Sequence, residues 1–123
     1  MKLIFLLLVL YQIKHFLCDY PLQTQYMLGK FKGGCEWKLP LTAHAAVHAA
    51  GTLVIGLCFA PVFGIAMLLA LLDFAAHFGI DRLKVVKGSY SQTDKRFWWA
   101  LGADQMAHHF THYAIISLLV FLR

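Results

Sequence analysis

The sequence is poor in charge. Only 14% of its 123 residues are Asp, Glu, Lys or Arg, and 60% are apolar. A soluble domain carries about 25% charged residues, and a chain this short cannot hide such an apolar excess in one core. The three cysteines form neither a CxxC pair nor an even framework, which argues against disulfides and thiolate metal sites. The composition favours an integral membrane protein.

Acidic residues are scarcer still, with 6 against 11 basic ones, so the net charge is +5. No recognisable nucleic-acid-binding module accompanies this charge, and we expect no nucleic-acid partner. The basic residues concentrate instead in two connections between apolar segments, Lys30 to Lys38 and Arg82 to Arg96. The positive-inside rule places both connections in the cytoplasm. Both termini and the turn at Pro61 then face outward, and we expect the bacterial inner membrane.

Four apolar segments approach the about 20 residues that a helix needs to cross a bilayer, at 3–28, 39–60, 62–81 and 97–122. We predict an all-α fold, an integral membrane bundle of about four transmembrane helices, with 1–123 as a single transmembrane domain. A soluble four-helix bundle is the alternative, but residues 52–72 are apolar on every helical face. A cleaved signal peptide is another alternative, but no small-residue cleavage site follows Tyr11.

Ionisable side chains recur every four residues inside these segments. They are His15 and Asp19; His44 and His48; Asp73, His77 and Asp81; and Asp104, His108 and His112. A spacing of four places neighbours one turn apart on one helix face. Because consecutive spans run in opposite directions, all four polar stripes fall in the cytoplasmic half of the bilayer. Charged groups at such depth are costly and usually functional.

Histidines and carboxylates that meet in a bundle core are typical of metal sites. Ligands without thiolate suit zinc first, with Mn or Fe as alternatives, and the number of groups allows one or two divalent ions. The predicted metal ligands are His15, His44, His48, Asp73, His77, Asp104 and His108. Asp19 and His112 are candidate acid/base residues, while Arg82, Lys84 and Lys87 would bind an anionic substrate. The roles of His109, Asp81 and Lys14 stay open.

A family resemblance rests on four motifs: HFLCDYPLQ at 15–23, the pair His44 and His48, DFAAHFGID at 73–81 with Lys84, and DQMAH at 104–108. With these motifs the chain resembles a family of small bacterial and phage membrane proteins known only as a domain of unknown function. The resemblance implies a membrane protein with several spans and no assigned activity. In style alone, the polar residues within the spans are also similar to those of membrane-bound metal-dependent hydrolases.

The leading hypothesis is a membrane-embedded, metal-dependent hydrolase that acts on an amphiphilic or phosphoester substrate from the cytoplasmic side. A transporter or channel component for metal ions or protons is the alternative, but residues 52–72 and 113–122 offer few polar side chains for a route outward. A regulatory subunit whose polar core only joins the helices is a third reading. The lipid bilayer is the expected partner, and a homodimer is an option because four spans make a thin bundle.

Overall fold

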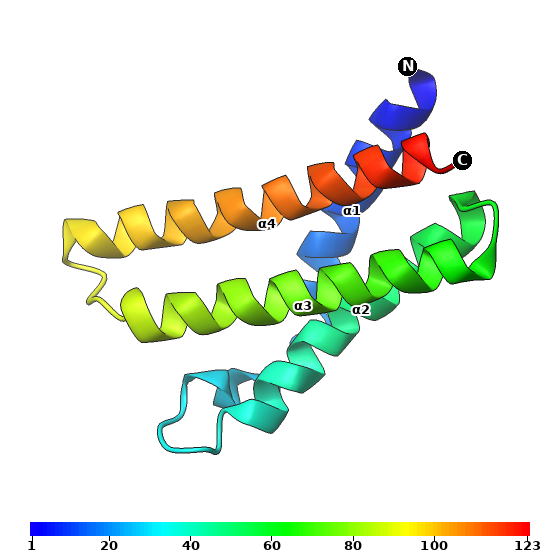
Figure 1. Cartoon of the computed structure of the whole chain (residues 1–123). Coiled ribbons are helices and arrows are strands. Elements are labelled where there is room, and N and C mark those ends of the chain that lie inside the picture. The colour runs from blue at the N-terminus through cyan, green and yellow to red at the C-terminus, as the bar shows by residue number, and fades with distance from the viewer.

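The structure, a computed structural model, describes residues 1–123 and contains helices but no β-strand. This confirms the all-α prediction. The four long helices are α1 (Lys2–Asp19), α2 (Lys38–Phe59), α3 (Phe63–Lys87) and α4 (Lys95–Phe121), and the short 3-10 helix η1 (Met27–Phe31) lies between α1 and α2. In Figure 1, α3 and α4 run side by side in opposite directions, and α1 and α2 cross behind them.

The connections lie at opposite ends of the bundle. Both termini and the turn between α2 and α3 lie at one end, which we call the terminal end (Figure 1). Residues 20–37 and residues 88–94 lie at the other, which we call the loop end. The two basic connections of the sequence therefore share one end of the molecule.

Two helices end at points that differ from the apolar segments. α1 ends at Asp19 rather than near residue 28, because Pro21 has no N–H group with which to continue the helical hydrogen bonds. α3 continues to Lys87 rather than stopping near 81, so Arg82, Lys84 and Lys87 are helical and not part of a loop. The helix ends where the N–H of Gly88 donates to the carbonyl oxygen of Lys84.

Helix α4 begins with a side-chain cap. The Asp94 carboxylate accepts hydrogen bonds from the backbone N–H and the guanidinium of Arg96. These bonds lower the pKa of the Asp94 carboxyl and satisfy one of the free N–H groups of the first turn. The cap fixes where the polar connection ends and α4 starts.

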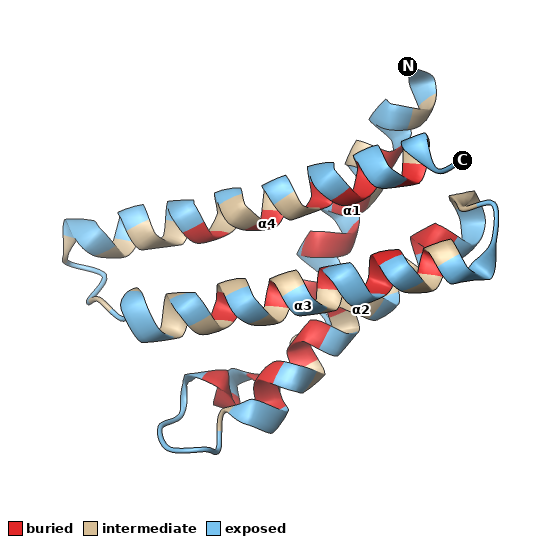
Figure 2. Ribbon diagram, viewed as in Figure 1, coloured by how far each residue is buried: buried red, intermediate tan, exposed pale blue.

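The interior is unusually polar. Of the 28 buried residues, 12 are polar or charged. Large apolar side chains face outward instead, with Phe5, Phe63, Phe110 and Phe121 each more than half exposed. In Figure 2, much of the outer surface of the helices is exposed, and the buried positions lie on their facing sides. Soluble proteins show the reverse distribution.

Two helices, α2 and α3, are long and apolar enough to cross a membrane. Only 39% of the apolar stretch of α2 and 28% of that of α3 is buried inside the molecule. A core helix of a soluble protein would be mostly buried. The exposed apolar surface of both helices is therefore more typical of a lipid environment.

An apolar cluster fills the bundle towards the terminal end. All four long helices contribute to it, and its buried members are Leu7, Tyr11, Ile55, Leu69, Ile115, Ile116 and Leu119. α2 and α3 approach closely there, since a Cβ atom on Gly56 would lie only 2.9 Å from the Cβ atom of Ala66. The buried histidines and aspartates lie between this cluster and the loop end.

Candidate metal centre

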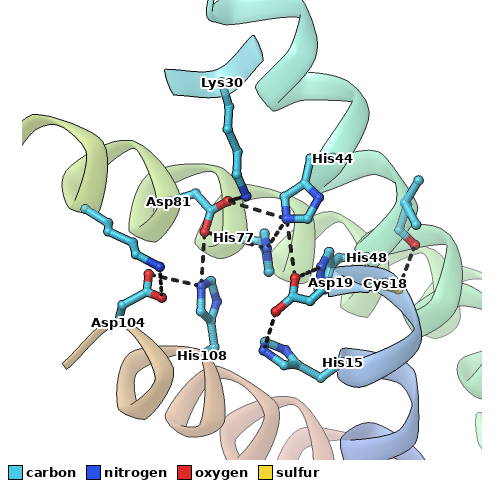
Figure 3. Close-up of polar contacts among 12 residues, drawn as sticks. His15, Cys18, Asp19, Lys30, His44, His48, His77, Asp81, Asp104 and His108 are labelled. Atoms are coloured by element: carbon cyan, nitrogen blue, oxygen red, sulfur yellow. Dashed lines mark hydrogen bonds and ion pairs between the residues drawn. The ribbon is translucent and has the colours of Figure 1, made fainter. Parts of the chain in front are cut away.

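Histidine and aspartate side chains from all four long helices converge in the bundle (Figure 3). The first group is Asp19, His44, His48 and His77, and the second is His77, Asp81 and His108. Within each group the potential ligand atoms all lie within 4.8 Å of one another. The groups share His77. The spacing of four residues explains the convergence, because it places His44 and His48, or His77 and Asp81, on one helix face.

Asp19, at the end of α1, joins three histidines. Its Oδ1 lies 3.0 Å from Nε2 of His48 and 3.5 Å from Nε2 of His44. Its Oδ2 lies 3.0 Å from Nε2 of His15. The sequence marked Asp19 as a candidate acid/base residue, whereas the geometry places it among the potential metal ligands.

Asp81 occupies the corresponding place on the other side of the centre. Its Oδ1 lies 3.2 Å from Nε2 of His108 and 3.8 Å from Nε2 of His77. Its Oδ2 lies 3.5 Å from Nε2 of His44 and accepts a 2.6 Å hydrogen bond from Nζ of Lys30. Asp81 is thus a buried member of the centre and does not pair with Lys84.

The chemistry of this centre suits a divalent cation. Nε2 of His44 and Nε2 of His77 are 3.3 Å apart, and the rings of His48 and His77 stack at 3.5 Å. Several nitrogen lone pairs and two carboxylates therefore face a small buried volume. Of the two carboxylates, Asp81 is paired with the ammonium group of Lys30. Neutral imidazole and carboxylate ligands without sulfur match zinc, manganese or iron. Buried Nδ1 atoms of His44 and His48 have no hydrogen-bond partner in the protein.

Two predicted ligands are engaged elsewhere. Oδ2 of Asp73 accepts hydrogen bonds from Nζ of Lys14 at 2.5 Å and from Oγ1 of Thr52 at 2.6 Å. Oδ2 of Asp104 accepts one from Nζ of Lys84 at 2.8 Å. Neither aspartate belongs to the two groups, although Oδ1 of Asp104 lies 3.5 Å from Nε2 of His108.

The remaining predicted histidines surround the centre. His15 contacts it through Asp19, and its ring lies 5.3 Å from the ring of His108. His112 lies deeper, with its ring 5.3 Å from Tyr11 and 5.2 Å from His15, and it belongs to neither group. His109 is only partly buried, because it lies off the line of Asp104, His108 and His112 on α4.

A polar pocket of about 190 Å³ connects the centre to the loop end. Its charged and histidine lining consists of Asp19, Lys30, Asp81, Lys84, Asp104 and His108. Of the three basic residues predicted to bind substrate, only Lys84 lines this pocket. Arg82 stacks on the ring of Trp37 at 3.6 Å, and Lys87 is exposed.

Lys30 is the pocket residue that the sequence did not single out. It lies in η1, whose fold brings a loop lysine back onto Asp81 of α3. In the sequence it contributes only to the basic character of a connection, and no spacing links it to Asp81. The contact depends on tertiary structure alone.

Comparison with known proteins identifies the family but no activity. Residues 4–122 match the family described as "Protein of unknown function (DUF3307)". No curated protein and no solved structure matches the chain significantly. The match includes every residue of the metal centre and of the pocket, and it confirms the resemblance to a domain of unknown function. The chain therefore belongs to the DUF3307 family of proteins of unknown function.

Proposed function

We propose that the chain is a four-span membrane protein of the bacterial inner membrane that binds divalent metal and hydrolyses an anionic ester. For the spans, α2 and α3 are apolar enough by themselves. α1 and α4 pack in the same bundle with outward-facing apolar side chains, such as Phe5 and Phe110, while His15 and His108 face inward. The positive-inside rule then orients the loop end towards the cytoplasm and the termini outward.

The two ligand groups accommodate one or two ions. The second group, His77, Asp81 and His108, offers three ligands, which is the number that catalytic zinc sites use to leave one position open. If His77 binds there, Asp19, His44 and His48 remain as a second set of three. Zinc is our first choice, with manganese or iron as alternatives. Two members of the second group, Asp81 and His108, line the pocket, whereas only Asp19 of the first group does, so we assign the reaction to the second group.

A divalent metal in the second group would supply a water molecule whose pKa is lowered to near 7, which makes it a nucleophile at neutral pH. Three aspartates also line the pocket, so the positive charge that an entering anion would meet there comes from Lys30 and Lys84. Each donates one hydrogen bond to a carboxylate, and an ammonium group has three N–H donors, so donors remain for substrate oxygens. Oδ1 of Asp104 accepts no hydrogen bond and is the candidate proton acceptor.

The observation that carries the proposal is that the three-ligand group borders a polar pocket, lined by two lysines, at one end only. Towards the terminal end, the apolar cluster around Leu7, Leu69 and Ile115 fills the bundle. A transporter needs a polar route to both faces, whereas a hydrolase needs one opening. The one-sided access therefore favours an enzyme over a metal or proton transporter.

Hydrolysis of soluble chromogenic esters tests the proposal. The detergent-purified chain, supplied with Zn²⁺, Mn²⁺ or Fe²⁺, should release nitrophenol from nitrophenyl phosphate or bis(nitrophenyl) phosphate. His108→Ala should lower the rate by about 100-fold, because it removes a ligand beside the pocket. His109→Ala, on the next residue but outside both ligand groups, should keep the wild-type rate. A folded wild-type chain without metal-dependent turnover on either ester would refute the hydrolase.

A further inference from the structure

A groove between α3 and α4 lies beside the polar pocket. It has a volume of about 240 Å³, and most of its walls are apolar, with Ile80 and Leu83 on α3 and Ala100, Ala103 and Ala107 on α4. The alanines leave space that larger side chains on α4 would fill. Small residues alone do not make a binding site, so the groove matters only because of what lies next to it.

Two charged residues connect the groove with the pocket. Lys84 and Asp104 line both, and they form the 2.8 Å ion pair between α3 and α4. Asp104 is only 6% exposed, yet its Oδ1 accepts no hydrogen bond. Lys87, one turn beyond Lys84, adds a second ammonium group to the groove. An apolar groove thus continues, across an ion pair, into the polar pocket beside the second ligand group.

The chemistry of these two connected spaces fits an amphiphile. An alkyl chain matches the apolar walls, and an anionic headgroup matches Lys84, Lys87 and Lys30. We propose that the substrate is a membrane amphiphile with an anionic ester headgroup, and that its alkyl chain lies in the groove between α3 and α4 while its headgroup enters the pocket. This assignment rests on the proposed hydrolase, since it names the substrate class of that site.

The groove between α1 and α2 is a natural comparison. It is larger, about 420 Å³, and is also mostly apolar. Its one charged lining residue, Lys14, is already paired with Asp73, and it shares no residue with the polar pocket. An alkyl chain in this groove would not place its headgroup at the metal centre. A substitution in the groove between α1 and α2 therefore serves as the control.

Binding of alkyl phosphates to the full, zinc-loaded chain in neutral detergent tests the assignment, with native mass spectrometry as the readout. The wild type should bind dodecyl phosphate more tightly than butyl phosphate. Ala103→Leu should weaken dodecyl phosphate binding by about tenfold, the effect of excluding roughly two methylene groups, and leave butyl phosphate binding unchanged. Ala50→Leu, which fills the groove between α1 and α2, should change neither. Both alanines are exposed, so both variants should fold.

Two results would overturn the assignment: equal binding of both phosphates by the wild type, or equal effects of Ala103→Leu and Ala50→Leu on dodecyl phosphate. The nitrophenyl phosphate assay separates this failure from failure of the hydrolase. Metal-dependent hydrolysis of the short ester, with no effect of Ala103→Leu on chain-length preference, would refute the assignment of the groove but support the proposed hydrolase. Binding of dodecyl phosphate that Ala103→Leu weakens, without any hydrolysis, would support the groove and refute the enzyme.

Discussion

Two buried lysines hold aspartates, one within the candidate metal centre and one beside it. Nζ of Lys30 lies 2.6 Å from Asp81, and Nζ of Lys14 lies 2.5 Å from Asp73, with each lysine no more than 8% exposed. A charge in such surroundings is tolerated only beside an opposite charge. The two pairs therefore fix η1 and α1 against α3, and Lys30 also orients a carboxylate of the centre.

Removing the lysine of such an ion pair should destabilise the fold, because the aspartate stays buried without its counter-ion. Lys30→Met should lower the free energy of unfolding by about 3 kcal/mol, because Asp81 is left buried without its ammonium partner. Lys32→Met is the matched control, since Lys32 is exposed and its ion pair with exposed Glu36 spans 3.5 Å. Denaturant unfolding of the metal-free chain in detergent measures both. Equal stability of the two variants would show that Lys30 does not hold Asp81.

The spacing of the polar residues predicts which side chains face inward but not which partners they meet. His44, His48, His77 and His108 converge as the spacing of four indicates. Asp73 lies one turn before His77 on the same face, yet it meets Lys14 of α1 and Thr52 of α2. The spacing predicts which face of each helix is buried. Which buried side chains pair with one another depends on how far neighbouring helices are shifted along their axes, and no local sequence pattern predicts that shift.

In the terminal half of the bundle, α2 and α3 approach each other closely. A Cβ atom at Gly56 would lie 2.9 Å from the Cβ atom and 3.0 Å from the Cα atom of Ala66. Backbone on the facing helix cannot yield as the end of a flexible side chain can. Gly56 thus allows the contact that sets the spacing of these two helices.

Gly56→Ala should destabilise the fold by about 1–3 kcal/mol, because α2 and α3 must move apart to admit the methyl group. Gly64→Ala is the control, since nothing lies within 4 Å of a Cβ atom at that position of α3. Thermal unfolding in detergent, followed by circular dichroism, compares the two. If Gly64→Ala cost as much as Gly56→Ala, the close approach would not explain the effect.

The apolar segments predict the existence of the helices, but the residues at the helix ends determine where each helix stops. The segment at 3–28 continues past Pro21, where the chain leaves α1 and then forms η1. The basic residues after Asp81 suggested a loop, although Leu83, Val85 and Val86 continue the helix as far as Lys87. Hydropathy reports how apolar a segment is and not whether its backbone is helical, so it misplaces the ends of both α1 and α3.

For the whole molecule, buried charge inside and apolar side chains outside support a protein whose solvent is lipid. The two basic connections at the loop end then give the proposed orientation. Cys35 lies exposed in the first of these connections, and Val62 lies exposed in the turn at the terminal end. In the proposed orientation, these two positions lie on opposite sides of the membrane.

Labelling with a membrane-impermeant maleimide in spheroplasts tests this orientation. A chain that keeps Cys35 alone should react only after the membrane is permeabilised, because the proposed orientation places the loop end in the cytoplasm. A Val62→Cys variant without the three native cysteines should react in intact spheroplasts. Reaction of both positions from the same side would contradict the four-span arrangement, and reaction from exchanged sides would invert it.

The most direct test of the account is the metal content of the purified chain, measured by mass spectrometry after incubation with Zn²⁺, Mn²⁺ or Fe²⁺ and removal of the excess. We predict at least one ion per chain in the wild type. His77→Ala should lose most of it, since His77 belongs to both groups, while His112→Ala, which removes an equally buried histidine outside both groups, should retain it. A folded wild-type chain without metal, or equal retention by the two variants, would contradict the metal centre and leave the buried polar residues as a structural core.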